Sequence, residues 1–284
     1  YHGDMETYFA AKSRLFHALP AEDKVGVINY DDPWGRRLLA GHSPSLGYGL
    51  SDMSGEPFES VQGEIVESSG KGMLLRTSYK NKTWDIETPL IGRHNASNLL
   101  AAQGAALSLG LGCNQMRRLS GFAGVPGRLE RVFNDRGLDI FVDYAHTPDA
   151  LVNVLTSLNR VGFERIVTVF GCGGDRDRAK RPLMGKAAAE LSDVVVLTSD
   201  NPRHEAPRAI MDEILPGIRA SERSPELYQE VSRAEAIRLA VGLMRPGDCL
   251  LVAGKGHETY QQIGDEFNDF SDVDHVREAL EALA

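Results

Sequence analysis

The feature that most constrains the fold is a repeated alternation of short apolar runs with helical patterns in the second half of the chain. The runs are continuous in apolar residues, which is typical of parallel strands that are covered on both faces. Helix signals lie between them, including Thr147 before Pro148 and a capping box from Ser232 to Glu235. Strand–helix alternation of this kind predicts a doubly wound α/β domain. The runs cover residues 140–142, 166–170, 194–198 and 249–253.

A polar loop follows each of the four runs directly. In open parallel sheets, ligands bind outside the carboxyl ends of the strands. We therefore expect the four loops to meet along one edge of the sheet and to form a binding site there. The loops are 143–148 (DYAHTP), 171–178 (GCGGDRDR), 199–205 (SDNPRHE) and 254–258 (GKGHE).

Cations gather where the second of these loops leads into a helix: Arg176, Arg178, Lys180 and Arg181. Positive charge at a helix N-terminus opposes the helix dipole. We interpret these side chains as partners of an anionic ligand that also binds backbone N–H groups. Lys255, between two glycines, resembles a phosphate-binding residue, but the chain contains no GxxxxGK[ST] motif.

The first part of the chain has a different organisation. An apolar stripe at helical spacing covers residues 5–16, and Lys12 lies in its middle, which is a local inconsistency that needs a reason. Residues 121–127 (GFAGVPG) have no periodicity and mark the expected domain boundary. Further predicted elements are strands at 24–30, 61–67 and 72–79, a hairpin at 68–72, and a helix at 97–109 that starts at Asn95 or Ser97.

Composition narrows the classes of function. The 31 basic and 40 acidic residues give a net charge of −9, which argues against a nucleic-acid-binding or anionic-membrane surface. No apolar run approaches the ~20 residues of a membrane span, and we expect no signal peptide. The three cysteines are far apart and lack CxxC spacing, so we expect no zinc site or disulfide framework and a cytoplasmic location.

Taken together and in order, the motifs of the chain resemble those of the Mur ligases. The resemblance extends from residue 1 to about residue 260, so it covers nearly the whole sequence. The matching segments are 1–6 (YHGDME) with 10–12 (AAK), 125–128 (VPGR), 143–148 (DYAHTP), 173–176 (GGDR), 200–203 (DNPR) and 254–258 (GKGHE).

The resemblance implies a three-domain enzyme of peptidoglycan synthesis, with a UDP-substrate domain, a central ATPase domain and a C-terminal Rossmann-like domain. The UDP-substrate domain and the P-loop have no counterpart in this sequence. We therefore expect residues 1–121 to be the back part of the central ATP-binding domain. Residues 122–284 are expected to be the Rossmann-like domain that binds the incoming amino acid. The chain is then a fragment, which by itself is expected to be inactive.

The implied reaction is amide formation that depends on ATP and Mg²⁺ and passes through an acyl phosphate. The members with the most similar motifs add meso-diaminopimelate to the D-glutamate of UDP-MurNAc-L-Ala-D-Glu. In the family, the lysine that matches Lys12 carries a carbamate that helps to order a magnesium ion. A lysine on an apolar stripe fits this role, because desolvation lowers the pKa of an amine and lets it react with carbon dioxide.

The other site residues are carried over position by position. His146 is expected to be catalytic. Which end of diaminopimelate each of Arg176, Arg203 and Glu258 holds stays open. The residues expected near ATP are Asn95, Arg128 and Asp143. The residues expected at the diaminopimelate site are Arg176, Asp200, Asn201, Pro202, Arg203, Gly254 and Glu258.

Two alternatives are kept. Within the superfamily, the chain could belong to a lysine-adding Mur ligase or a folylpolyglutamate-type ligase, but the loop 200–203 (DNPR), which ends in Arg203, argues against both. Lysine-adding relatives usually carry a non-basic residue at that position. In another class, the chain is a non-catalytic binding module, which fits the missing P-loop. A GxxxxGKT upstream of Tyr1 would decide for the enzyme.

Overall fold

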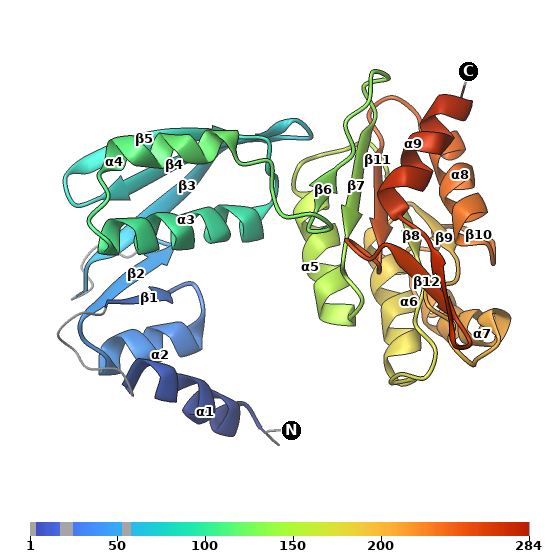
Figure 1. Ribbon diagram of the computed structural model, residues 1–284, viewed down its shortest axis with the longest axis horizontal. Coiled ribbons are helices and arrows are strands. Elements are labelled where there is room, and N and C mark those ends of the chain that lie inside the picture. The colour runs from blue at the N-terminus through green and yellow to red at the C-terminus, as the bar shows by residue number, and fades with distance from the viewer. Residues whose placement is uncertain (1–3, 18–24, 53–57, 284) are drawn as a thin grey trace. The chain divides into compact units, whose positions relative to one another are not determined.

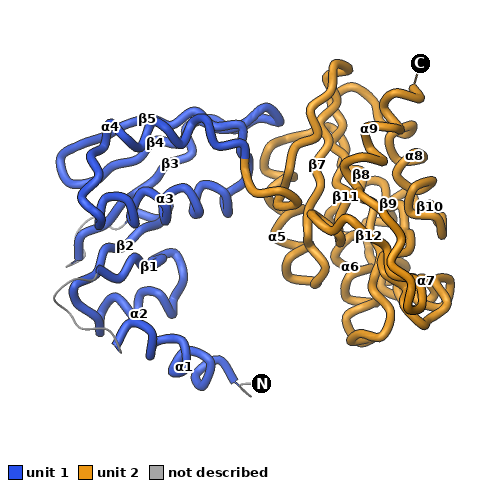
Figure 2. The backbone as a smooth tube through the Cα atoms, viewed as in Figure 1, with its two compact units in different colours: residues 1–123 blue, residues 124–284 orange. Residues whose placement is uncertain are grey.

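The computed structural model describes residues 4–17, 25–52 and 58–283. The chain divides into two compact units, residues 1–123 (unit 1) and 124–284 (unit 2), which are shown in Figure 2. Residues 1–3 of the first motif and residue 24 of the first expected strand lie outside the described residues. No helix in the described part of the chain is long and apolar enough to cross a lipid bilayer.

Unit 1 is built on a five-stranded sheet in the order β1-β2-β3-β4-β5. The pairs β1/β2 and β2/β3 are parallel, while β3, β4 and β5 form an antiparallel meander. The expected hairpin is present, since β3 and β4 pair from the turn that begins after Ser69. The elements are α1 (Met5–His17), β1 (Gly26–Asn29), α2 (Pro33–Gly41), β2 (Ser45–Gly49), β3 (Ser60–Ser69), β4 (Gly72–Tyr79), β5 (Lys82–Thr88), α3 (Arg93–Ser108), α4 (Cys113–Met116) and a 3₁₀ helix (Arg117–Gly121).

Two helix starts in unit 1 differ from the sequence predictions. The helix expected from Asn95 or Ser97 begins earlier, after Gly92, and the Asn95 side chain donates to the Ile91 carbonyl at 2.9 Å. Helix α2 was not predicted. Its N-cap is Asp32, whose carboxylate accepts hydrogen bonds from the amides of two residues of the first turn, and Pro33 follows at the first helical position.

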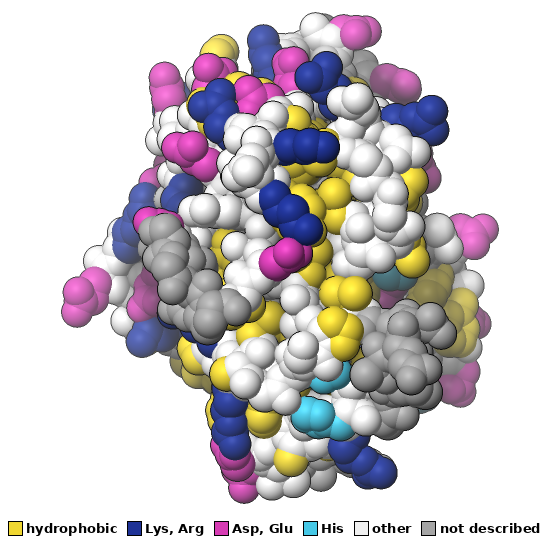
Figure 3. All heavy atoms as spheres, turned by 90° about the vertical axis from the view of Figure 1, so that its left-hand side faces the viewer, with side chains coloured by type: hydrophobic (Ala, Val, Ile, Leu, Met, Phe, Trp, Pro, Cys, Tyr) yellow, Lys and Arg dark blue, Asp and Glu magenta, His cyan; other side chains and the backbone are white. Residues whose placement is uncertain are grey.

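The core of unit 1 lies between the sheet and α3, where Leu46, Val61, Leu75 and Leu100 pack together. Helix α1 contributes little to it. Phe9 and Phe16 contact a small cluster around β1 and α2, but no residue of α1 is buried. Figure 3 shows other apolar side chains exposed among charged ones on the viewed face.

Unit 2 confirms the doubly wound α/β prediction. Its six-stranded sheet has the order β10-β9-β8-β11-β7-β6, and every pair except β6/β7 is parallel. The four predicted runs are β7, β8, β9 and β11. The elements are β6 (Glu130–Arg131), β7 (Asp139–Asp143), α5 (Pro148–Asn159), β8 (Ile166–Phe170), α6 (Lys180–Leu191), β9 (Val194–Leu197), α7 (Pro207–Arg219), β10 (Glu226–Gln229), α8 (Arg233–Leu243), β11 (Cys249–Ala253), β12 (Tyr260–Ile263), β13 (Glu266–Asp269) and α9 (Asp272–Ala282).

Helices cover both faces of this sheet, which explains why its central strands β8, β9 and β11 are buried at every position. Helices α8 and α9 pack on one face, where Ile237 and Val276 join the valines of the strands. Helices α5, α6 and α7 lie together on the other face (Figure 1). The caps at Thr147 and Ser232 are present as predicted, each accepting a hydrogen bond from a first-turn amide. The antiparallel hairpin β12–β13 was not predicted.

Candidate functional site

The four polar loops of unit 2 are tied together at one edge of the sheet, as the sequence predicts. The first and fourth loops join through the Gly254 amide, which donates to the Asp143 carbonyl at 3.0 Å. The second and third join through the Gly174 amide, which donates to the Asn201 carbonyl at 2.9 Å. The third and fourth join where the Asn201 side chain donates to Glu258 at 2.9 Å.

Glycine is required where the second and third loops touch. A Cβ atom at Gly174 would lie 1.9 Å from the Pro202 carbonyl oxygen, and one at Gly171 would lie 2.4 Å from the Thr198 carbonyl oxygen. Both distances are far below van der Waals contact. The glycines therefore allow the two loops to pack backbone against backbone, which brings the side chains at their tips into one site.

Arg203 is held in an unusual backbone conformation at the tip of the third loop. Its φ is 50°, in the left-handed region that non-glycine residues rarely adopt. The half-buried side chain donates from Nη1 to the Gly174 carbonyl at 2.8 Å and from Nε to Gln262 Oε1 at 3.1 Å. Pro202 before it is buried, which fixes the loop from the other side.

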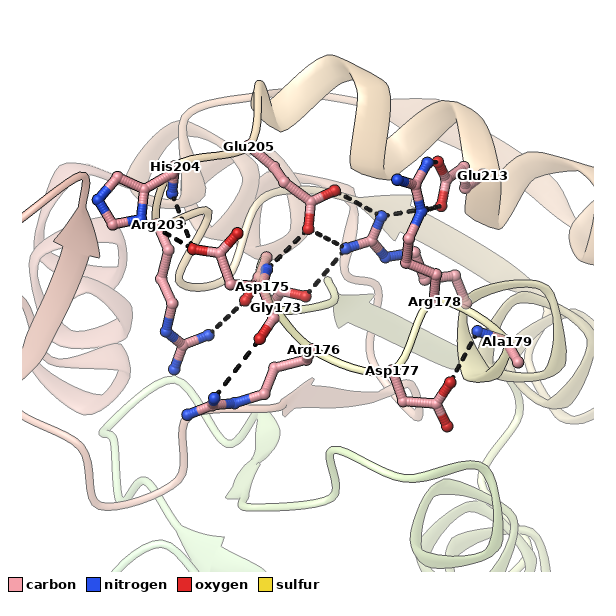
Figure 4. A network of polar contacts seen from close by, with 12 residues as sticks. Gly173, Asp175, Arg176, Asp177, Arg178, Ala179, Arg203, His204, Glu205 and Glu213 are labelled. Atoms are coloured by element: carbon pink, nitrogen blue, oxygen red, sulfur yellow. Dashed lines mark hydrogen bonds and ion pairs between the residues drawn. The ribbon is translucent and has the colours of Figure 1, made fainter.

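Arg176 and Arg203 flank the same spot beside Gly173. A Cβ at Gly173 would lie 3.0 Å from Nη1 of Arg203 and 3.9 Å from Cγ of Arg176. Figure 4 shows both side chains on the same side of the loop. Within the described ranges, neither guanidinium forms an ion pair with a carboxylate. The site thus presents two positive charges without protein counter-ions, which suits a ligand carboxylate.

Carboxylates form the neighbouring part of the site. Asp200 is 8% exposed, and its Oδ1 accepts no hydrogen bond in the described structure. Burial raises the pKa of the Asp200 carboxyl, an effect that the nearby Arg233 and Lys255 oppose. Glu258 uses its Oε2 to accept hydrogen bonds from Asn201 and from Lys255. An ammonium group would satisfy the open acceptors of the two carboxylates.

Lys255 is fully buried, so the resemblance to a phosphate-binding lysine was misleading. Its Nζ donates to Asn201 Oδ1 at 3.0 Å and to Glu258 Oε2 at 3.2 Å, and it lies 3.7 Å from Asp200 Oδ1. The ring of Tyr260 covers it at 5.5 Å. The side chain therefore supports the acidic part of the site from inside the protein.

A second buried cation, Arg233, contacts the starts of the third and fourth loops from inside the domain. Arg233 is 1% exposed, and its guanidinium donates to both carboxylate oxygens of Asp272 at 2.7 Å. It also donates to the carbonyls of Ala253 at 3.0 Å and Ser199 at 3.4 Å. Those carbonyls belong to the residues just before Gly254 and Asp200, so Arg233 connects the starts of two site loops.

The interpretation of the cations near α6 needs correction for two of them. Arg181 is fully buried and donates to Glu205 at 2.7 and 2.9 Å and to Glu213 at 2.8 Å. Arg178 pairs with Glu213 as well (Figure 4). The anions that these two arginines need are thus supplied by α7 and the loop before it. Arg176 and Lys180 form no ion pair with a carboxylate in the described residues, and Lys180 donates instead to the His146 carbonyl at 2.8 Å.

The first loop carries the residues expected near ATP. Both oxygens of Asp143 accept backbone hydrogen bonds, from Leu129 and from Ala145, each at 2.7 Å. Arg128 is exposed, with its guanidinium 4.8 Å from the centre of the Tyr144 ring. His146 is exposed, and its Nδ1 donates to the Tyr144 carbonyl at 2.8 Å. In the neutral imidazole this leaves Nε2 as the basic nitrogen.

Unit 1 contributes Lys12 and Asn95 to the expected set. The expectation that Lys12 is desolvated is wrong in this structure, because its side chain is exposed and lies 5.5 Å from the Tyr8 ring. Three side chains of the apolar stripe that suggested burial are themselves exposed: Met5 by 55%, Tyr8 by 42% and Leu15 by 66%. Asn95 is 7% exposed at the start of α3.

The described residues do not form a magnesium site by themselves. No three histidine, cysteine or carboxylate side chains among them lie close enough to hold a metal ion. Glu6, on the same helix as Lys12, is paired with Arg37 at 2.6 Å. We therefore assign no magnesium ligands from this geometry.

Several residues of the site were missed by sequence reasoning. Gln261 and Gln262 lie on the unpredicted strand β12, and both bond to the third loop. Glu205, in the third loop, was assigned no role from the sequence, whereas it pairs with Arg181. The Gly264-Asp265 pair between residues 260–263 and 266–269 is a two-residue turn signal that points to a hairpin carrying the two glutamines. No local pattern indicates the pairing of Glu205.

Family models and sequence relatives of this chain point to the same family. Residues 1–106 match the Mur ligase middle domain, and residues 127–256 match the glutamate ligase domain of Mur ligases. The UDP-N-acetylmuramoyl-L-alanyl-D-glutamate--2,6-diaminopimelate ligase of Lawsonia intracellularis (strain PHE/MN1-00) is 52% identical over 280 residues, which are 99% of this chain and 58% of the relative. The enzyme of the same name from Geobacter metallireducens (strain ATCC 53774 / DSM 7210 / GS-15) is 45% identical, covering 100% of this chain and 58% of the relative.

Solved structures agree. A structure of a UDP-N-acetylmuramoyl-L-alanyl-D-glutamate--2,6-diaminopimelate ligase matches all of this chain and 58% of its own, with 36% identity and a TM-score of 0.69. The folylpolyglutamate synthase of Mycobacterium tuberculosis shares the fold at 21% identity and a TM-score of 0.67. The chain thus spans a little over half the length of the curated relatives it matches. With both domain models matched in order along its length, the chain belongs to the Mur ligases.

Proposed function

We propose that this chain is part of an ATP-dependent amide ligase that adds meso-diaminopimelate to the D-glutamate of UDP-MurNAc-L-Ala-D-Glu. The observation that carries the proposal is the charge arrangement at the loop tips of unit 2. Arg176 and Arg203 have no carboxylate partner in the described residues. Asp200 and Glu258 lie beside buried Lys255, and Oδ1 of Asp200 accepts no hydrogen bond from the described residues. Diaminopimelate carries a carboxylate and an ammonium at each end, so it complements both parts.

The two parts of the site suggest how the amino acid is oriented. A carboxylate at one end would lie at the arginines, where Nη2 of Arg203 makes no hydrogen bond to the described residues. An ammonium would lie at Asp200 and Glu258, which Lys255 and Asn201 hold in place. Lysine lacks one of the two carboxylates and would leave a guanidinium unpaired, which is costly in a half-buried site.

The proposed reaction has two steps. The D-glutamate carboxylate of the UDP-linked substrate attacks the γ-phosphate of ATP, which forms an acyl phosphate and releases ADP. The neutral amine of diaminopimelate then attacks the acyl carbon, the C–O bond to phosphate breaks, and the amine proton leaves. We propose His146 for a role in catalysis, since Nε2 of its neutral ring is free to accept a proton. Arg128, Asp143 and Asn95 are proposed to lie near ATP.

The test is the selectivity of Arg203 variants in a full-length ligase that carries this sequence. Arg203→Ala removes the guanidinium, and Arg203→Lys keeps a charge without the planar fork. A hydrogen bond to a charged group contributes about 1.5–3 kcal/mol. We expect kcat/KM for diaminopimelate to fall roughly 10- to 150-fold in both variants, with little change for lysine. An unchanged preference would mean that the terminal carboxylate is recognised elsewhere.

A further inference from the structure

Gln262 on β12 connects the hairpin to the two central residues of the third loop. Its backbone amide donates to Asn201 Oδ1 at 2.9 Å, and its backbone carbonyl accepts from the Arg203 amide at 3.1 Å. Its side chain adds two more bonds. Oε1 accepts from Nε of Arg203 at 3.1 Å, and Nε2 donates to the Gly264 carbonyl at 3.1 Å.

These bonds also fix the rare backbone conformation of Arg203. The Arg203 amide donates to Gln262, and the Arg203 carbonyl accepts from the Gly264 amide at 2.8 Å, so the hairpin brackets the residue from both sides. A φ of 50° is unfavourable for arginine and persists where the surroundings determine it. The hairpin therefore sets both the backbone and the side-chain direction of Arg203.

The side chain of Gln262 is a neutral partner for a charged group. Its amide orientation is determined, because Nε2 needs the Gly264 carbonyl as acceptor and Oε1 needs the Arg203 donor. A carboxylate in this place would form an ion pair with Arg203 and cancel its charge. The amide satisfies one donor of the guanidinium and leaves the positive charge uncompensated on the side facing the site.

We propose that Gln262 is a specificity-determining positioning residue. It orients the guanidinium of Arg203 while leaving its charge unpaired, so that an amino acid with a second, terminal carboxylate is selected over lysine. The inference rests on the proposed function, since it concerns how the same site tells the two amino acids apart. It predicts that the charge of residue 262 controls selectivity, although residue 262 need not touch the ligand.

The test uses three variants in a full-length ligase that carries this sequence, with steady-state kinetics for diaminopimelate and lysine. Gln262→Glu keeps the shape and adds the competing carboxylate. We expect its kcat/KM for diaminopimelate to fall at least 100-fold while that for lysine is unchanged or rises. Gln262→Met removes only the side-chain bonds, and we expect a roughly ten-fold rise in KM for diaminopimelate with kcat unchanged.

The matched control is Gln261→Met, on the adjacent residue. The Gln261 side chain bonds to Ser199 Oγ at 3.2 Å and to the Asp200 carbonyl at 2.7 Å, and its hydrogen bonds do not reach Arg203. We expect it to lower turnover of both amino acids alike, so the ratio of diaminopimelate to lysine stays at the wild-type value.

Three results would overturn the inference in distinguishable ways. A wild-type ratio in folded Gln262→Glu would overturn the role of Gln262 alone. If that variant does not fold, Gln262→Met is the deciding variant. An equal rise in KM for diaminopimelate and for lysine would then contradict the role of Gln262. A wild-type enzyme that does not use diaminopimelate at all would overturn the proposed function and this inference with it.

Discussion

Replacing Arg233 by methionine should lower the free energy of unfolding of unit 2 by about 3–5 kcal/mol. The side chains of Arg233 and Asp272 are both fully buried, and their two hydrogen bonds are each 2.7 Å long. Methionine fills similar space but leaves the Asp272 carboxylate buried without its counter-ion. It also removes the donors to the carbonyls of Ala253 and Ser199.

The size of the loss in unfolding free energy distinguishes the effect of an unpaired buried charge from a simple loss of packing. The double variant Arg233→Met with Asp272→Leu removes both charges and should cost about 1–2 kcal/mol, mainly for the two carbonyls that lose a hydrogen bond. The coupling energy between the two positions is then at least about 2 kcal/mol in a double-mutant cycle. A large coupling means that the charges stabilise the fold as a pair and not singly.

Urea denaturation, followed by two spectroscopic probes, measures the loss of stability of unit 2. Both tryptophans, Trp34 and Trp84, lie in unit 1, so their fluorescence reports that unit, while circular dichroism reports both. With a urea m-value of about 2 kcal/mol per M, the circular dichroism midpoint of unit 2 should fall by roughly 2 M in Arg233→Met. The tryptophan midpoint should not move. A shift worth less than about 1 kcal/mol, or a double variant that costs the sum of the singles, would refute the reasoning.

Three further predictions follow from the site. Asp200→Asn should raise the melting temperature of unit 2, because burial raises the pKa of the Asp200 carboxyl and its ionised form is costly to bury. The same variant should lower kcat/KM for diaminopimelate. Thermal denaturation checks the first outcome and steady-state kinetics the second. Hydrogen bonds from Arg181 lower the pKa of Glu205 from 4.5 to about 2, so their stabilisation is complete above pH 4.5 and is lost as the pH falls to about 2. The melting temperature of Glu205→Gln should be less dependent on pH in that window. On the basis of the resemblance, Lys12→Ala in a full-length ligase should abolish turnover, with acetate but not bicarbonate restoring part of it, and wild-type turnover would contradict the carbamate.

The sheet of unit 2 was predictable because its strands carry their own signal. The run 249–253 is apolar at every position and 166–170 at all but Thr168, and both are buried throughout, which is typical of a strand covered on both faces. The position of the site followed from the same observation, since each run ends in a polar loop. In unit 1 the sequence predicts the strand at 24–30 but not the helix that follows it, whose cap is Asp32 with Pro33 at the first helical position.

What the sequence did not reveal depends on contacts between distant residues. The four cations near α6 look alike locally, yet Arg181 is buried against Glu205 and Glu213 while Arg176 is open. Lys255 also needed the third loop to explain its burial. Helical periodicity places Lys12 on an apolar stripe but does not determine what covers that stripe, and Lys12 is exposed.

The strand order of unit 2 has a consequence for how the protein is made. Strand β11 lies between β7 and β8, although it follows both by a long stretch of chain. On the ribosome, β7 and β8 therefore emerge early and keep an unpaired edge each until residues 249–253 appear. Unpaired edges of apolar strands are templates for aggregation. Translation that pauses before Cys249 would leave the nascent chain with an open seam in the middle of its sheet, exposed to proteases and chaperones.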